Sequence, residues 1–102
     1  MIKPTVGRRL WFWPGDTAGR YNTLSHDQPF DAGVLYVHSD TEVNLLVTDH
    51  TGFTFRAENT QLVQEGEERP TGPHATWMPF QQGQARVQRD AGPVGQSAEP
   101  NG

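Results

Sequence analysis

Histidines and carboxylates are the side chains of this sequence that could support metal or acid–base chemistry. Imidazole and carboxylate groups would suit zinc or another divalent ion if several of them converged. The four histidines, His26, His38, His50 and His74, are scattered and show no recognised ligand spacing. We therefore expect exposed or edge histidines that form ordinary hydrogen bonds, and no metal site.

Acidic side chains give no stronger signal for catalysis. The closely spaced ones are Asp40 with Glu42, and Glu65 with Glu67 and Glu68. Acid–base pairs need burial or proximity to shift one pKa, and these residues lie in polar segments where water screens them. The run Ser25-His26-Asp27 has the residue types of a hydrolytic triad, but adjacent residues cannot converge as triad members do. No glycine-rich phosphate-binding loop is present. The sequence predicts a protein that is not an enzyme and needs no cofactor.

Aromatic and arginine side chains near the N-terminus are the better candidates for a functional surface. The candidate partner-binding residues are Arg8, Arg9, Trp11, Trp13, Arg20 and Tyr21. Exposed aromatic rings beside arginines suit stacked bases or a proline-rich peptide. In the alternative, the segment 21–30 folds over Trp11 and Trp13 and makes a second small core.

Two-residue hydrophobic alternation places these residues on β-strands. The pattern predicts strands at 6–13, 32–38, 42–48, 53–56 and 74–80, and a short turn with a brief strand at 59–64. In the first strand Leu10 and Phe12 point one way, while Trp11 and Trp13 point the other. The strand 32–38 is apolar on both faces, which favours a strand covered on two sides.

The connections favour a small barrel. Asp49-His50-Thr51-Gly52 is typical of a hairpin turn, in which Asp49 accepts backbone hydrogen bonds and Gly52 takes a positive φ. A long first loop, a tight central hairpin and a closing strand predict an all-β, five-stranded SH3-like barrel over residues 1–82. An oligonucleotide-binding-type barrel is the alternative, but it would usually need a helix that the pattern lacks. Residues 83–102, rich in Gln, Gly, Pro and Ser, are expected to be a disordered tail.

Composition narrows the classes of function. The 102 residues include no cysteine, which excludes disulfides and thiolate chemistry. No apolar stretch approaches the roughly 20 residues that span a bilayer, and the N-terminus lacks a signal-peptide pattern, so we expect an intracellular protein. The net charge is −4, and all of it lies in residues 1–82, because the tail's two arginines balance its two acidic residues. Nucleic-acid binders usually carry a basic excess, so that function is less favoured.

Several segments together resemble small uncharacterised proteins of tailed bacteriophages and prophages. The segments that carry the resemblance are 7–13, 31–40, 43–52 and 77–81. The resemblance spans most of residues 7–85 and implies a viral setting, with the protein in the host bacterial cytoplasm or in the virion. The family has no assigned activity, so the resemblance implies no catalytic residues.

We expect a phage-encoded binding or assembly module that acts through contacts with a phage or host protein. The alternative is a small-barrel nucleic-acid-binding protein that uses the N-terminal arginines and tryptophans. A factor that inhibits a host protein through the acidic segment 65–68 and a homo-oligomer joined by an aromatic strand are further possibilities.

Overall fold

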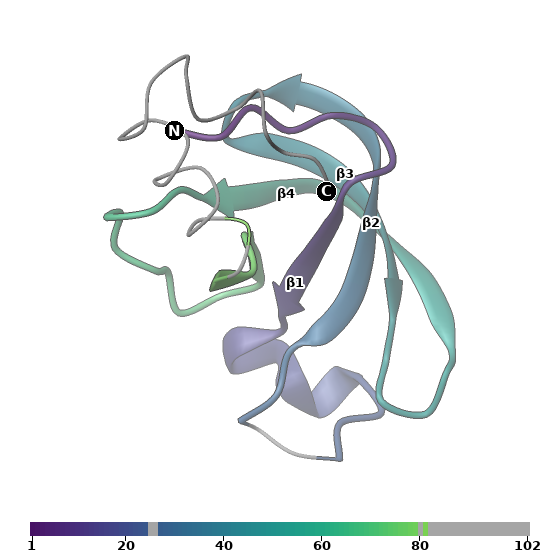
Figure 1. Cartoon of the computed structure of the whole chain (residues 1–102). Coiled ribbons are helices and arrows are strands. Elements are labelled where there is room, and N and C mark those ends of the chain that lie inside the picture. Colours follow the sequence, from purple (N-terminus) through teal and green to yellow (C-terminus); the bar gives the residue numbers. More distant parts are fainter. Residues whose placement is uncertain (25–26, 80, 82–102) are drawn as a thin grey trace.

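The chain folds into a closed barrel of five β-strands (Figure 1). The computed structural model describes residues 1–24, 27–79 and 81. Its elements are β1 (Arg9–Trp13), the 3-10 helix η1 (Gly15–Arg20), β2 (Phe30–Ser39), β3 (Glu42–Thr48), β4 (Thr54–Val63) and β5 (His74–Thr76). The predicted all-β, SH3-like five-stranded barrel is therefore confirmed. The predicted boundary at residue 82 and the disordered tail lie outside the described residues.

Each of the five strands pairs with two neighbours, and this closes the barrel. Strands β1 to β4 form an antiparallel meander, β1 also pairs antiparallel with β5, and β4 pairs with β5 in parallel. The parallel pairing is short and joins Leu62 to Ala75 and Val63 to Thr76. Closure satisfies backbone groups that an open sheet would expose to other chains.

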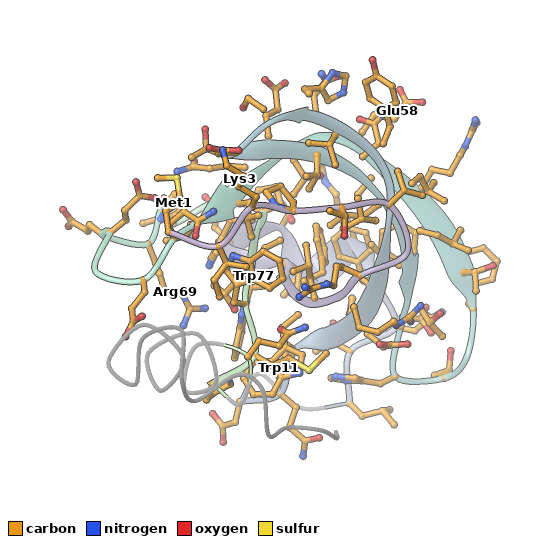
Figure 2. All side chains as sticks on the ribbon, turned by 45° about the horizontal axis from the view of Figure 1, so that its top comes forward. Met1, Lys3, Trp11, Glu58, Arg69 and Trp77 are labelled. Atoms are coloured by element: carbon orange, nitrogen blue, oxygen red, sulfur yellow. The ribbon has the colours of Figure 1, made fainter. Side chains whose placement is uncertain are left out.

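The core fills the barrel interior, as the alternation predicts. Leu10 and Phe12 of β1 are buried, and so are Val43, Leu45 and Val47 of β3. The complete buried cluster is Leu10, Phe12, Phe30, Ala32, Val34, Val43, Leu45, Val47, Leu62, Ala75 and Trp77. Trp77 follows β5 and lies inside the ring of strands at one end of the barrel (Figure 2).

The prediction that β2 is covered on both faces is wrong. Leu35 and Tyr36 are 46% and 58% exposed. Pairing with β3 shifts register between Val34 and Tyr36, and again between Val37 and Ser39. Such bulges turn side chains away from strict alternation. A single barrel also supplies no second layer outside β2, so apolar residues there remain in contact with water.

Strand boundaries differ from the predicted ones where glycine or a bulge intervenes. β1 starts at Arg9 because Gly7, with φ of 93°, forms a turn before it. β4 is one continuous strand, although the sequence predicted a break between residues 56 and 59. A bulge in its pairing with β3 and a positive φ at Asn59 accommodate the irregularity without ending the strand. β5 is shorter than predicted and ends at Thr76.

The hairpin between β3 and β4 forms as predicted. The Asp49 carboxylate accepts hydrogen bonds from the backbone N–H groups of Thr51 (2.9 Å) and Phe53 (3.0 Å), and Gly52 has φ of 93°. Burial by itself raises the pKa of Asp49, but hydrogen bonds from Thr51, Phe53 and Asn22 outweigh it and lower the pKa. The ionised carboxylate is therefore part of the folded hairpin.

Candidate functional site

The outward side of β1 carries two tryptophans. Arg9, Trp11 and Trp13 alternate with buried Leu10 and Phe12, as the two-residue period requires. The Trp11 and Trp13 rings meet edge to face, with centroids 6.0 Å apart, and both are half-buried. Figure 2 shows Trp11 outside the ring of strands, whereas Trp77 lies within it. We call the surface formed by Trp11, Trp13, Gln28, Pro29 and Arg69 the tryptophan face.

Contacts from two other segments hold Trp13 in place. Its indole Nε1 donates a hydrogen bond to Thr76 Oγ1 of β5 at 3.0 Å. The Arg69 guanidinium, from the loop between β4 and β5, lies 4.2 Å from the centroid of the Trp13 ring. This distance is that of a cation–π contact. Trp13 is therefore a fixed platform and not a freely rotating surface side chain.

Beneath Arg69 lies a buried histidine that is directly opposite Trp13 in the β1–β5 register. His74 Nε2 accepts a hydrogen bond from Arg69 Nε at 2.9 Å, and its Nδ1 lies 2.9 Å from the Gly72 carbonyl oxygen. Nδ1 therefore carries the proton and donates to Gly72. Burial lowers the pKa of His74, the Arg69 charge lowers it further, and the Gly72 hydrogen bond partly opposes both. A neutral His74 thus fixes the orientation of Arg69.

Two hollows border Trp13. One encloses about 360 Å³ and is lined by Trp13, Arg69, Pro70 and residues of η1. The other encloses about 460 Å³ and is lined by both tryptophans, Pro29 and two aspartates. Trp13 and Gln28 border both hollows. The tryptophan face is therefore a grooved surface, open on both sides of a rigid aromatic ring.

The segment 21–30 does not build a second core over the tryptophans in its described part. Tyr21 and Phe30 turn inward instead: the Tyr21 ring stacks on Phe55 with centroids 4.9 Å apart and meets Phe30 edge to face. Both rings also contact Phe12, so they close one end of the main core. The described residues of this segment that border the tryptophan hollows are Thr23, Asp27, Gln28 and Pro29.

The six predicted partner-binding residues do not form one patch. Arg9, Trp11 and Trp13 share the outer side of β1. The Arg8 guanidinium lies 5.7 Å from the ring of Trp77 at the barrel end. Arg20 and Tyr21 line a separate hollow that also includes Asp49 of the β3–β4 hairpin.

Among the arginines that the structure describes, Arg9 is the one in an ion pair with another described residue. Its guanidinium forms an ion pair with Asp31 of β2, across the strand. Its backbone carbonyl accepts a hydrogen bond from the Gln81 side chain at 3.1 Å. The positive charge predicted beside the tryptophans is therefore largely neutralised.

Arg69 is the functional candidate that sequence reasoning missed. It is a single arginine in a loop rich in Glu, Gly and Pro, and it lies far along the chain from Trp13. No local periodicity relates the two positions. The one signal in the sequence is that a lone cation is available in an acidic loop close to the last strand.

His38, His50 and Asp40 form ordinary hydrogen bonds or ion pairs with other parts of the described chain. His38 lies 2.9 Å from the Asn44 side-chain oxygen, and the two ring nitrogens of His50 contact the Leu24 amide and the Pro29 carbonyl. Asp40 pairs with Lys3 at 3.4 Å. His26 lies outside the described residues. Within the described part of the chain, no group of three or more acidic or histidine side chains is arranged to hold a metal ion.

Comparisons of the chain with protein-family models, with curated proteins and with solved structures gave no match. In the part of the chain that the structure describes, no helix is long and apolar enough to cross a membrane. The fold and the site thus define a small β-barrel with a rigid, grooved aromatic surface.

Proposed function

We propose that this chain is a non-catalytic binding or assembly module, encoded by a tailed phage or prophage, that docks a phage or host protein on its tryptophan face. The setting rests on the resemblance described above and would place the protein in the host bacterial cytoplasm or in the virion. The mode of action rests on the geometry of β1 and its surroundings.

The observation that carries the proposal is the pair of half-exposed tryptophans beside two hollows, one lined by both rings and the other by Trp13. Tryptophan and arginine are enriched among the residues that dominate the energy of protein interfaces. Trp13 is held by Thr76 and Arg69 before any partner arrives. A fixed ring loses little conformational entropy on binding, so more of its contact energy remains as affinity.

Charge favours a protein partner over a nucleic acid. Arg9 is paired with Asp31, Asp27 lines the same hollow, and Arg8 and Arg20 lie elsewhere. A backbone-binding surface needs several cations that can neutralise phosphates. Because Arg9 is paired and Arg8 and Arg20 lie elsewhere, the tryptophan face has no excess of positive charge from these three arginines.

The test is capture of partners from a lysate of the phage-infected host, with Trp11→Ala compared with the unaltered chain. The Trp11 side chain forms no hydrogen bond with another described residue, and the variant keeps the backbone pairing of β1, so the fold should remain intact. Loss of a central aromatic anchor should weaken binding by at least about tenfold, measured as the affinity for the captured protein.

Tyr36→Ala is the matched control, because Tyr36 is an exposed aromatic residue of β2 that does not line either hollow. Equal loss in both variants, or no loss in Trp11→Ala, would contradict the proposal. Binding of a mixed-sequence oligonucleotide that falls steeply with salt would favour the nucleic-acid alternative. A dimer mass in light scattering, abolished by Trp11→Ala, would make a second copy the partner.

A further inference from the structure

Arg69 is the cation of the tryptophan face; its position is fixed, and no ion pair joins it to another described residue. Its Nε is bound to His74 and its guanidinium plane covers Trp13. Between described residues, the ion pairs are those of Lys3 with Asp40 and Arg9 with Asp31, and neither involves Arg69. The residue itself is exposed. Figure 2 shows Arg69 at the periphery of the barrel, away from its interior.

A guanidinium held in this way is well suited to a carboxylate. The group presents several N–H donors in a planar fork, which matches the two oxygens of a carboxylate. One donor, the Nε–H, is used by His74, and the terminal nitrogens form no hydrogen bond with another described residue. Because Trp13 and His74 already restrict the side chain, little further ordering is needed when a ligand binds.

The surrounding walls indicate what else the ligand must contain. The hollow beside Arg69 is bordered by Trp13, Pro14, Ala18 and Pro70, which are apolar and suit an aliphatic or proline segment. This hollow meets the second one at Trp13 and Gln28. A peptide in the groove would therefore pass over Trp13 and continue on both sides, as an internal segment does.

Charge indicates where an acidic side chain of that peptide would lie. Arg69 borders one hollow, whereas Asp31, which borders the other, is already paired with Arg9. An acidic side chain would therefore be attracted to Arg69. We propose that the tryptophan face binds an extended peptide segment of its protein partner, with an Asp or Glu side chain seated on Arg69. This inference rests on the proposed function and names the chemistry of its partner.

The experiment is a titration of the isotope-labelled full chain with two capped pentapeptides, acetyl-Pro-Pro-Glu-Pro-Pro-amide and the same peptide with Gln in place of Glu. The prolines keep the probe extended and supply apolar contact. The indole N–H signals of Trp11 and Trp13 and the Arg69 Nε–H signal report binding by NMR. We expect the Glu peptide to bind about three to ten times more tightly than the Gln peptide, as for a partly exposed charged hydrogen bond.

Variants of Arg69 distinguish recognition from general charge. Arg69→Gln should remove the preference for the Glu peptide, and Arg69→Lys should keep only part of it, because lysine lacks the planar fork. Arg56→Gln is the matched control, since Arg56 is an exposed arginine of β4 that does not line either hollow. The control should keep the full preference.

Equal affinities for the two peptides, a preference that survives in Arg69→Gln, or no binding of either peptide at about 10 mM would each overturn the inference. These outcomes are separate from the test of the proposed function, because the titration uses purified protein and no natural partner. If Trp11→Ala abolished partner capture while the peptides bound equally, the result would support docking on the tryptophan face and contradict carboxylate recognition by Arg69.

Discussion

At the scale of single residues, the contacts Gly72–His74–Arg69–Trp13 link a buried imidazole to the surface. Each link depends on the previous one: the Gly72 carbonyl fixes the His74 tautomer, and the unprotonated Nε2 then accepts from Arg69. Arg69 in turn lies over Trp13. Asp16 is the acidic group on the far side of Gly72, 3.8 Å from the position that a Cβ of Gly72 would take. The protonation state of His74 therefore affects the position of Arg69 and, through it, the shape of the tryptophan face.

This link predicts a dependence of stability on pH. The pKa of His74 is lowered from 6.5 on folding, so the unfolded chain takes up this proton first as the pH falls. The contribution of neutral His74 to the free energy of unfolding is fully present above about pH 6.5. It is lost as the pH falls from there through the pKa of His74 in the folded chain. Each unit of lowered pKa corresponds to about 1.4 kcal/mol.

Urea unfolding at pH 7.5 and pH 5.5 measures the effect, and His74→Gln is the comparison. The free energy of unfolding of the unaltered chain should fall more between these two pH values than that of the variant. Parallel losses in the two proteins would show that other groups cause the pH dependence. The change in free energy between pH values is the readout, so a less stable variant still gives a valid comparison.

At the scale of elements, η1 is attached to the loop that carries Arg69. The Asp16 amide donates to the Thr71 carbonyl at 2.8 Å, and Gly15 has φ of 61°. A Cβ on Gly15 would lie 2.3 Å from the Thr71 oxygen and 2.6 Å from the Gly72 oxygen. Both neighbours are backbone atoms that cannot move without displacing the loop. Close approach of two backbones thus requires glycine here.

Gly15→Ala should therefore lower the free energy of unfolding by about 2 kcal/mol or more, because it adds a clash to an unfavourable backbone conformation. Gly19→Ala in the same helix is the matched control: no atom lies within 4 Å of its Cβ position, and its φ is not positive. This change should be neutral or slightly stabilising. Urea unfolding followed by tryptophan fluorescence measures both, and similar effects at the two positions would refute the explanation.

At the scale of the whole molecule, one buried glutamine joins three segments that lie far apart along the chain. The Gln64 side-chain oxygen accepts from Ile2 N and Trp77 Nε1, each at 3.2 Å. Its amide nitrogen donates to the carbonyls of Ile2 (2.9 Å) and Asp40 (2.8 Å). Figure 2 shows the N-terminal segment crossing this end of the barrel, in front of Trp77. Gln64 thus closes the end of the core with all four of its hydrogen-bonding positions used.

Gln64→Ala should cost about 3 kcal/mol of unfolding free energy, because it leaves buried backbone and indole groups without partners. Gln61→Ala is the control, since Gln61 is an exposed glutamine of β4, which ends just before Gln64, and should change stability by less than about 0.5 kcal/mol. Chemical unfolding in urea compares the two. A Gln64→Ala protein as stable as the control would mean that water or repacking satisfies the freed groups.

Sequence alone determined the buried faces of β1 and β3 and the position of the hairpin between β3 and β4. Leu10 and Phe12, and Val43, Leu45 and Val47, point inward because the pleat of a strand fixes side-chain direction through neighbours two residues away. The hairpin at Asp49 likewise follows from the chemistry of four consecutive residues. These features depend on short-range geometry, so their prediction did not require knowledge of the rest of the chain.

Only the tertiary structure decided what surrounds Trp11 and Trp13. Closure of the barrel sets β5 beside β1, and this brings Arg69 and His74 to Trp13 from far along the chain. The same packing draws Tyr21 inward to Phe55 and pairs Arg9 with Asp31. Such contacts depend on how distant segments meet in space, which no periodicity or turn pattern encodes. The two tryptophans were therefore visible in the sequence, whereas the cation that completes their surface was not.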